Sequence, residues 1–163
     1  MPETPWWKGA RGEWYVVAQV FLFALVVFGP STVPGLPAWR EPYAALASAV
    51  GLALMLAGGA LAAAGLVGLG RVNLTALPYP RDGSTLVVTG PYRIVRNPIY
   101  SGLIFGAFGY ALRVNGWLTL GYALLLFIFF DVKSRKEELW LAEKFSDYAA
   151  YQQRVKKLIP WVY

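Results

Sequence analysis

Hydrophobic and polar positions alternate in long blocks along this chain, not residue by residue. Four apolar runs are separated by polar connections, and they cover residues 14–28, 43–70, 99–114 and 117–130. Runs of this length and composition predict an all-α integral membrane protein with four transmembrane helices. Three runs are short for a hydrocarbon core of roughly 30 Å, so we expect flanking Trp and Tyr side chains to complete each span.

Two polar segments lie between and after these runs. Residues 71–98 are expected to form a connecting loop, and residues 132–158 follow the fourth run. The apolar side chains of the second segment recur every three or four residues, at Leu141, Phe145, Tyr148, Tyr151 and Val155. This spacing predicts one amphipathic C-terminal helix whose apolar face lies back on the membrane domain. Residues 1–163 are therefore expected to form a single membrane domain.

The distribution of charge gives the expected orientation. Thirteen of the fifteen Lys and Arg residues precede the first run, lie within residues 71–98, or follow the fourth run. The positive-inside rule places that side in the cytoplasm, together with both termini. Because the basic residues lie close to helix ends, the net charge of +6 favours contact with anionic membrane lipids over nucleic-acid binding.

Composition narrows the possible chemistry. A mean hydropathy of +0.46 is too high for a soluble domain with a charged surface. The chain has no cysteine and no histidine. It therefore has no disulfide, no thiolate nucleophile, no Cys or His metal site and no histidine acid–base catalyst, and we predict no metal.

Small residues predict close helix packing. In the second run they include Gly51, Gly58, Gly59, Gly65 and Gly68. In the third run, Gly102 and Gly106 form a small-xxx-small pair of the kind that lets helix backbones approach in lipid. Asn115 and Gly116 predict a tight turn, which would make the third and fourth runs an antiparallel hairpin.

The start of the third run is a candidate ligand site. Asn97 suits the N-cap of a helix and Pro98 suits its first turn, so free N–H groups should face the cytoplasmic interface. With Arg93 and Arg96 nearby, this helix end favours an anion such as a carboxylate.

A pair of carboxylates forms the second candidate. Glu137 and Glu138 lie where the fourth helix leaves the bilayer. The simplest interpretation is that these carboxylates lie on a solvated helix surface, where Glu137 forms an ordinary ion pair with Lys133 one helical turn before it. Against it, adjacent carboxylates at a membrane boundary are costly unless cationic partners face them.

Together these elements resemble the isoprenylcysteine carboxyl methyltransferase and phospholipid N-methyltransferase families of membrane enzymes. The resemblance covers roughly Leu69 to Pro160. The matching motifs, in order, are Gly90-Pro91-Tyr92, Arg96-Asn97-Pro98-Ile99-Tyr100, Glu137-Glu138, Leu141, Phe145, Tyr148, Tyr151 and Pro160. Asn97 departs from the histidine usual in these families. We expect Asn97 to cap the helix, since methyl transfer to a carboxylate or thiolate depends mainly on alignment.

The resemblance implies that S-adenosyl-L-methionine binds in a pocket facing the cytoplasm. This pocket would lie between the loop that carries the Arg96-Asn97-Pro98-Ile99-Tyr100 motif, the third and fourth helices, and the C-terminal segment after the fourth run, called the tail below. Glu137 or Glu138 would hold its ammonium, arginine or helix N–H groups its carboxylate, and tyrosine rings its adenine or sulfonium. The implied catalytic residues are Arg96, Asn97 and Glu138. The implied cofactor-binding residues are Gly90, Tyr92, Arg96, Asn97, Pro98, Tyr100, Glu137, Glu138 and Tyr148.

The expected function is S-adenosylmethionine-dependent methyl transfer to a lipophilic acceptor at the cytoplasmic membrane face. An isoprenylcysteine carboxylate, a phospholipid amine, a thiol and an isoprenoid lipid all remain candidate acceptors. Sterol reductases that use NADPH share a similar Arg-His-Pro-x-Tyr motif but are longer chains. A non-enzymatic scaffold or transporter subunit is the other alternative. A transporter should place ionisable groups near the bilayer midplane. The only strongly polar side chain well inside an apolar run of this sequence is Gln19, which is not ionisable, so the transporter alternative has little support.

Overall fold

The computed structural model describes residues 12–75 and 83–163, and in these residues the protein is all-helical. The elements are α1 (Glu13–Phe28), α2 (Tyr43–Asn73), the short 3₁₀ helix η2 (Gly90–Arg93), α3 (Pro98–Arg113), α4 (Trp117–Lys144) and α5 (Tyr148–Arg154). This part of the chain has no β-strand, which agrees with the all-α prediction. Part of the expected loop, residues 76–82, lies outside the described residues.

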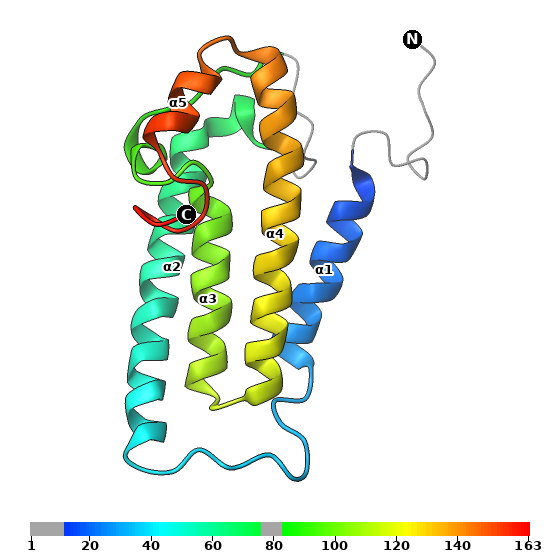
Figure 1. Ribbon diagram of the computed structural model, residues 1–163, viewed down its shortest axis with the longest axis vertical. Helices are drawn as coiled ribbons and strands as arrows, with labels where there is room; N and C mark the ends of the chain where they lie inside the picture. Colours follow the sequence, from blue (N-terminus) through cyan, green and yellow to red (C-terminus); the bar gives the residue numbers. More distant parts are fainter. Residues whose placement is uncertain (1–11, 76–82) are drawn as a thin grey trace.

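The four longer helices run along the length of the molecule, and Figure 1 shows α2, α3 and α4 side by side with α1 next to α4. The connection between α1 and α2 crosses one end. The segment before α3, helix α5 and the C-terminal residues all gather at the other end. Segments far apart in the sequence therefore meet at that end of the molecule.

Two helices are long and apolar enough to cross a membrane, namely α2 with 31 residues and α4 with 28. Helix α1 is also apolar but has only 16 residues. In α2 the regular helix is interrupted at Gly70, whose φ of 70° and ψ of 166° suit glycine alone. The kink redirects the last turn of α2, which ends at Asn73 and contributes to the cavity described below.

Helices α2 and α3 pack with their backbones in close contact. A Cβ atom added at Gly58 would lie 2.5 Å from the carbonyl oxygen of Gly102, and one at Gly51 would lie 2.4 Å from that of Gly109. No larger side chain fits at such a distance. The predicted close packing is present, but Gly109 and not Gly106 shares this role with Gly102, because a Cβ at Gly106 would meet no atom within 4 Å.

The connection between α3 and α4 is the expected tight turn. Asn115 has a φ of 51°, in the left-handed region that asparagine tolerates better than most residues. The amide of Gly116 donates to the carbonyl of Ala111, 3.0 Å away. Helices α3 and α4 consequently lie side by side as a hairpin (Figure 1).

The C-terminal segment differs from the single helix expected over residues 132–158. Helix α4 continues without a break to Lys144, Phe145 is extended with φ −122° and ψ 112°, and α5 begins at Tyr148. The physical reason is burial, since one straight helix would carry Tyr148 and Tyr151 away from the rest of the protein. The break turns α5 back, and both side chains are buried.

Candidate functional site

The chain just before α3 is fixed to the C-terminal segment by backbone hydrogen bonds. Val95 and Lys156 form an isolated parallel bridge. The amide of Arg96 donates to the carbonyl of Lys156 at 2.8 Å, and that of Asn97 donates to the carbonyl of Lys157 at 3.2 Å. These contacts place the Arg-Asn-Pro motif against a segment sixty residues away in the sequence.

Arg96 links this segment to α4 through a two-pronged ion pair. Its Nε donates to Glu138 Oε1 at 2.9 Å and its Nη2 donates to Glu138 Oε2 at 3.1 Å. The side chains are only 11% and 9% exposed, respectively. Nη1 donates to the carbonyls of Gln152, at 3.1 Å, and Val155. Most of the donor groups of the guanidinium are therefore used in holding the fold together.

Asn97 occupies the N-cap position of α3, but its side chain makes no capping hydrogen bond. Its Nδ2 donates instead to Glu138 Oε1 at 3.3 Å and to the carbonyl of Lys157 at 3.2 Å. The expected capping role of the side chain is thus replaced by a bridge between α4 and the C-terminal segment. The backbone carbonyl of Asn97 accepts two bonds from Ser101, each 2.9 Å long.

The adjacent Glu137 lies in a different environment from Glu138. Its Oε1 accepts a hydrogen bond from the Tyr100 hydroxyl at 2.5 Å. The Tyr100 ring stacks on Phe130 with the ring centres 4.6 Å apart, which fixes the position of that hydroxyl. Glu137 lines the cavity of the site, whereas Glu138 does not.

A cavity of about 280 Å³ lies among α1, α2, α3, α4, α5 and the segment before α3. Its wall combines leucine side chains with tyrosine rings and a few polar groups. Among the polar wall residues are Gln19, Asn73, Thr85, Arg96, Asn97, Lys133 and Glu137. An apolar cavity with a few convergent polar groups is the usual form of a small-molecule site.

Most of the site residues expected from the sequence line this cavity. They are Tyr92, Arg96, Asn97, Pro98, Tyr100, Glu137 and Tyr148. Two expected residues do not line it. Gly90 begins η2 with a φ of 58°, and Glu138 faces Arg96.

Three tyrosines on the loop and tail hold this end of the molecule together. The Tyr92 hydroxyl donates to the carbonyl of Gly65 at 3.3 Å, and the Tyr151 hydroxyl donates to the carbonyl of Tyr92 at 2.6 Å. Burial, with a further contribution from the charge of Glu137, raises the pKa of Tyr92 to about 12. Burial also raises the pKa values of Tyr148 and Tyr151. All three therefore remain protonated near neutral pH, and Tyr92 and Tyr151 act as hydrogen-bond donors.

Gln19 and Lys133 are among the cavity residues that were not expected at the site. Lys133 is 2% exposed, so its interpretation as half of a solvated surface pair is wrong. Its Nζ donates to Gln19 Oε1 at 2.8 Å and lies 5.1 Å from the centre of the Tyr100 ring. The polar Gln19 within an apolar run was the available signal, but the sequence does not reveal its partner 114 residues away.

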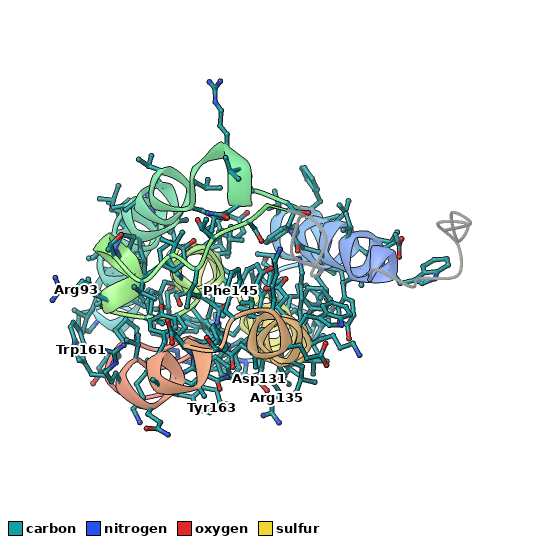
Figure 2. All side chains as sticks on the ribbon, turned by 90° about the horizontal axis from the view of Figure 1, so that it is seen from above. Arg93, Asp131, Arg135, Phe145, Trp161 and Tyr163 are labelled. Atoms are coloured by element: carbon teal, nitrogen blue, oxygen red, sulfur yellow. The ribbon has the colours of Figure 1, made fainter. Side chains whose placement is uncertain are left out.

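A second polar cluster fastens the C-terminal residues to α4. Asp131 accepts hydrogen bonds from Lys157 and from the Tyr163 hydroxyl, the latter at 2.8 Å, and pairs with Arg135 at 2.8 Å. Figure 2 shows Asp131, Arg135 and Tyr163 gathered beside α4. This cluster fixes the segment whose backbone carbonyls, on Lys156 and Lys157, accept the hydrogen bonds from the amides of Arg96 and Asn97.

Comparison with known proteins places this architecture in a family. The family model described as phospholipid methyltransferase matches residues 46–148. The cobalt-zinc-cadmium resistance protein CzcN of Cupriavidus metallidurans is 29% identical over 91% of this chain and 62% of its own length. A probable protein-S-isoprenylcysteine O-methyltransferase of Oryza sativa subsp. indica is 30% identical over 71% of this chain and 62% of its own.

A third relative is the protein-S-isoprenylcysteine O-methyltransferase B of Arabidopsis thaliana. It is 29% identical over 69% of this chain and 58% of its own length. The chain thus spans about three fifths of the length of these curated relatives. The matched family segment runs from α2 into α5 and contains the Arg96 motif and both glutamates. The chain therefore belongs to the phospholipid methyltransferase family.

Proposed function

We propose that this protein is an S-adenosyl-L-methionine-dependent methyltransferase that methylates a lipophilic acceptor at the cytoplasmic face of a membrane. The observation that carries the proposal is the cavity lined by the Arg96–Tyr100 motif and by Glu137, in a chain of a methyltransferase family. An isoprenylcysteine carboxylate, a phospholipid amine or another small lipid is the acceptor class.

The groups in the cavity fit the chemistry of the cofactor. Glu137 supplies a carboxylate for its ammonium, and the tyrosine rings and leucines supply faces for its adenine. The first-turn amides of α3 have no intrahelical acceptors, so they suit its carboxylate. Arg96 is the weaker candidate for that carboxylate, because Glu138 and two backbone carbonyls already engage its guanidinium.

When bound, the cofactor supplies an electrophilic methyl group on a sulfonium. The residues of this chain align it and exclude water, and alignment is the main requirement when the acceptor is a carboxylate or thiolate. Glu138, Arg96 and Asn97 then act by positioning, since they hold the start of α3 against α4. Asn97 carries an amide and takes no proton from the acceptor.

We also propose that α1, α2, α3 and α4 each cross the membrane, with both termini and the site on the cytoplasmic side. The length and apolarity of α2 and α4 support this arrangement. It is supported further by the clustering of Lys and Arg at the end of the molecule where the cavity lies.

Titration of S-adenosylhomocysteine into the detergent-purified protein by calorimetry tests the proposed cofactor site. We expect saturable binding by the wild type and a loss of about tenfold or more in Glu137→Gln, which removes one charge-assisted contact in the cavity. Glu143→Gln makes the same change on an exposed face of α4 and should bind like the wild type.

The alternatives give different results in the same titration. Binding of NADPH without S-adenosylhomocysteine would favour a reductase, and no cofactor affinity in a folded wild-type protein would favour a scaffold. Equal losses in Glu137→Gln and Glu143→Gln would place the cofactor away from Glu137.

A further inference from the structure

The chain after α5 returns to the apolar part of α4. Leu158 is fully buried and belongs to the same apolar cluster as Phe130. The ring of Tyr163 lies beside that of Phe127, with the ring centres 6.4 Å apart, and both phenylalanines are part of the apolar run 117–130. In Figure 1 the last residues accordingly lie below α5, alongside the longer helices. In the proposed membrane arrangement, this is the depth at which α4 enters the bilayer.

The residues from Leu158 to Tyr163 form a compact turn, called the C-terminal turn below. The amides of Leu158 and Ile159 both donate to a backbone oxygen of Tyr163 at 2.7 Å. Trp161 has a φ of 61°, a left-handed conformation that is unusual for a bulky residue and costs free energy. Trp161 is 81% exposed and Val162 is 72% exposed. The backbone of the turn thus holds two apolar side chains on the surface of the molecule.

The surroundings of the C-terminal turn are basic. Residues 90–101 and 152–163, which the parallel bridge joins, contain five Lys and Arg residues and no Asp or Glu. Two of the five, Arg96 and Lys157, pair with carboxylates of α4. The other three are exposed, and they are Arg93, Arg154 and Lys156.

Exposed cations next to exposed apolar side chains suit a lipid surface. Figure 2 shows Arg93 and Trp161 on the same side of the molecule. Tryptophan prefers the boundary between headgroups and acyl chains, and Lys and Arg attract the anionic headgroups of the cytoplasmic leaflet. Because the turn lies beside the apolar run of α4, its position favours lipid over a soluble partner.

We propose that the C-terminal turn, with Arg93 and Lys156, is a membrane-contact surface for anionic phospholipids of the cytoplasmic leaflet. Trp161 and Val162 lie at the boundary between headgroups and acyl chains, and the two cations contact the headgroup phosphates. The inference goes beyond the proposed function and takes from it the crossing of α4 with this end in the cytoplasm. Backbone carbonyls just before the turn accept the amides at the start of α3, so a lipid-bound turn also steadies the cofactor site.

A single fluorophore measures the depth of the turn. The natural chain has no cysteine, so Val162→Cys places one nitrobenzoxadiazole label beside an intact Trp161. The nanodiscs contain lipids with a nitroxide near the top of the acyl chain. We expect about half of the fluorescence to be quenched, because an interfacial segment lies roughly 5–10 Å into this boundary. A label at Glu143→Cys, on an exposed part of α4 beyond the apolar run, should keep its fluorescence.

Substitutions at Trp161 test whether this side chain holds the turn in the bilayer. Trp161→Ser in the chain labelled at Val162→Cys should reduce the quenching, because serine has no affinity for the interface. Trp161→Phe keeps a large apolar ring and should retain most of the quenching.

Nitroxide lipids with different headgroups test the role of charge. Phosphatidylglycerol should quench the Val162→Cys label more than phosphatidylcholine does, with an enrichment of the anionic lipid of about fivefold or more, as one Lys or Arg near the surface provides. The double variant Arg93→Gln/Lys156→Gln should lose this preference. Arg40→Gln makes the same change at an exposed arginine in the connection between α1 and α2, and should retain it.

A Val162→Cys label quenched no more than the Glu143→Cys label would show that the turn faces water or another protein, and would overturn the proposal. So would quenching that Trp161→Ser leaves unchanged, equal quenching by the two headgroups, or a preference that survives in the double variant. S-adenosylhomocysteine binding to the wild type is measured separately in the same nanodiscs. Its absence would count against the proposed function and leave the lipid contact standing.

Discussion

Glu137 and Glu138 show how adjacent residues acquire separate roles. Neighbouring positions on an α-helix point about 100° apart, so two successive side chains of α4 face different surroundings. Glu138 faces Arg96 and the tail, where it accepts bonds from Arg96, Asn97 and Gln152. Glu137 faces Tyr100 and the cavity. Glu138 therefore holds α4 to the start of α3 and to the tail, and Glu137 lines the cavity that we propose as the cofactor site.

Replacing Glu138 should destabilise the protein. Glu138→Ala leaves the buried guanidinium of Arg96 without its carboxylate, and the loss of one member of a buried pair costs about 3 kcal/mol or more. For a chain of this size that corresponds to a decrease in melting temperature of several degrees. Thermal unfolding in detergent, followed by tryptophan fluorescence, measures it.

Glu143→Ala is the matched control, since Glu143 is exposed on the same helix and should unfold like the wild type. Arg96→Lys should also lower the melting temperature, because an ammonium cannot reproduce the two parallel bonds to Glu138 and reach the tail carbonyls as well. A Glu138→Ala protein as stable as Glu143→Ala would show that the ion pair contributes little.

At the scale of elements, the position of the site depends on the close contact between α2 and α3, which we call the α2–α3 seam. Gly51, Gly58 and Gly65 recur every seven residues on α2 and are buried. Gly65 packs against Pro98 and Ile99, at the very start of α3. The same glycine face that brings the helices together therefore also places the first turn of α3 beside the cavity.

A methyl group on this seam should separate the helices. In Gly58→Ala the new Cβ would meet the Gly102 carbonyl oxygen at 2.5 Å, so the backbones must move apart. Overpacking of this kind costs about 1–3 kcal/mol. We expect a lower melting temperature in thermal unfolding followed by tryptophan fluorescence, and weaker S-adenosylhomocysteine binding in the calorimetric titration.

Gly59→Ala is the control at the next position, where an added Cβ meets no atom within 4 Å. Because alanine favours helix more than glycine does, by up to about 1 kcal/mol, this variant should be as stable as the wild type or slightly more stable. Equal effects of the two substitutions would contradict the packing argument.

The sequence predicts the helices well and the tail poorly. Helices α1, α2 and α3 begin and end close to the first three apolar runs, and α4 begins where the fourth run begins, because period and composition are local properties. Helix α4 continues well past the end of its run, to Lys144. The spacing of Leu141, Phe145, Tyr148 and Tyr151 suits a straight helix equally well. The turn at Phe145 depends on what buries the tyrosines, which is a long-range property.

The candidate site shows the same division between local and long-range information. The Arg96–Tyr100 motif and the two glutamates are recognisable locally, and the structure brings them together. Which glutamate faces the cavity depends on the rotation of α4 about its axis. The contact between Gln19 and Lys133 depends on how α1 docks against α4. Neither can be obtained from residue spacing alone.

At the scale of the whole molecule, the site and the charged segments share one end. The cavity, the tail and the segment before α3 gather there, and the connection between α1 and α2 crosses the other end (Figure 1). A water-soluble cofactor and a lipid acceptor can both reach such a site if that end faces the cytoplasm. The proposed function thus depends on the membrane orientation.

Single cysteines can test this orientation, because the natural chain has none and each variant then carries one reactive thiol. Thr32→Cys lies in the exposed connection between α1 and α2, and Glu143→Cys lies near the end of α4. In intact cells a membrane-impermeant maleimide should label Thr32→Cys and spare Glu143→Cys. After permeabilisation both should be labelled, which confirms that each thiol is accessible. Labelling of Glu143→Cys in intact cells would place the cavity outside the cytoplasm and remove its access to S-adenosylmethionine, since that cofactor is expected from the cytosol.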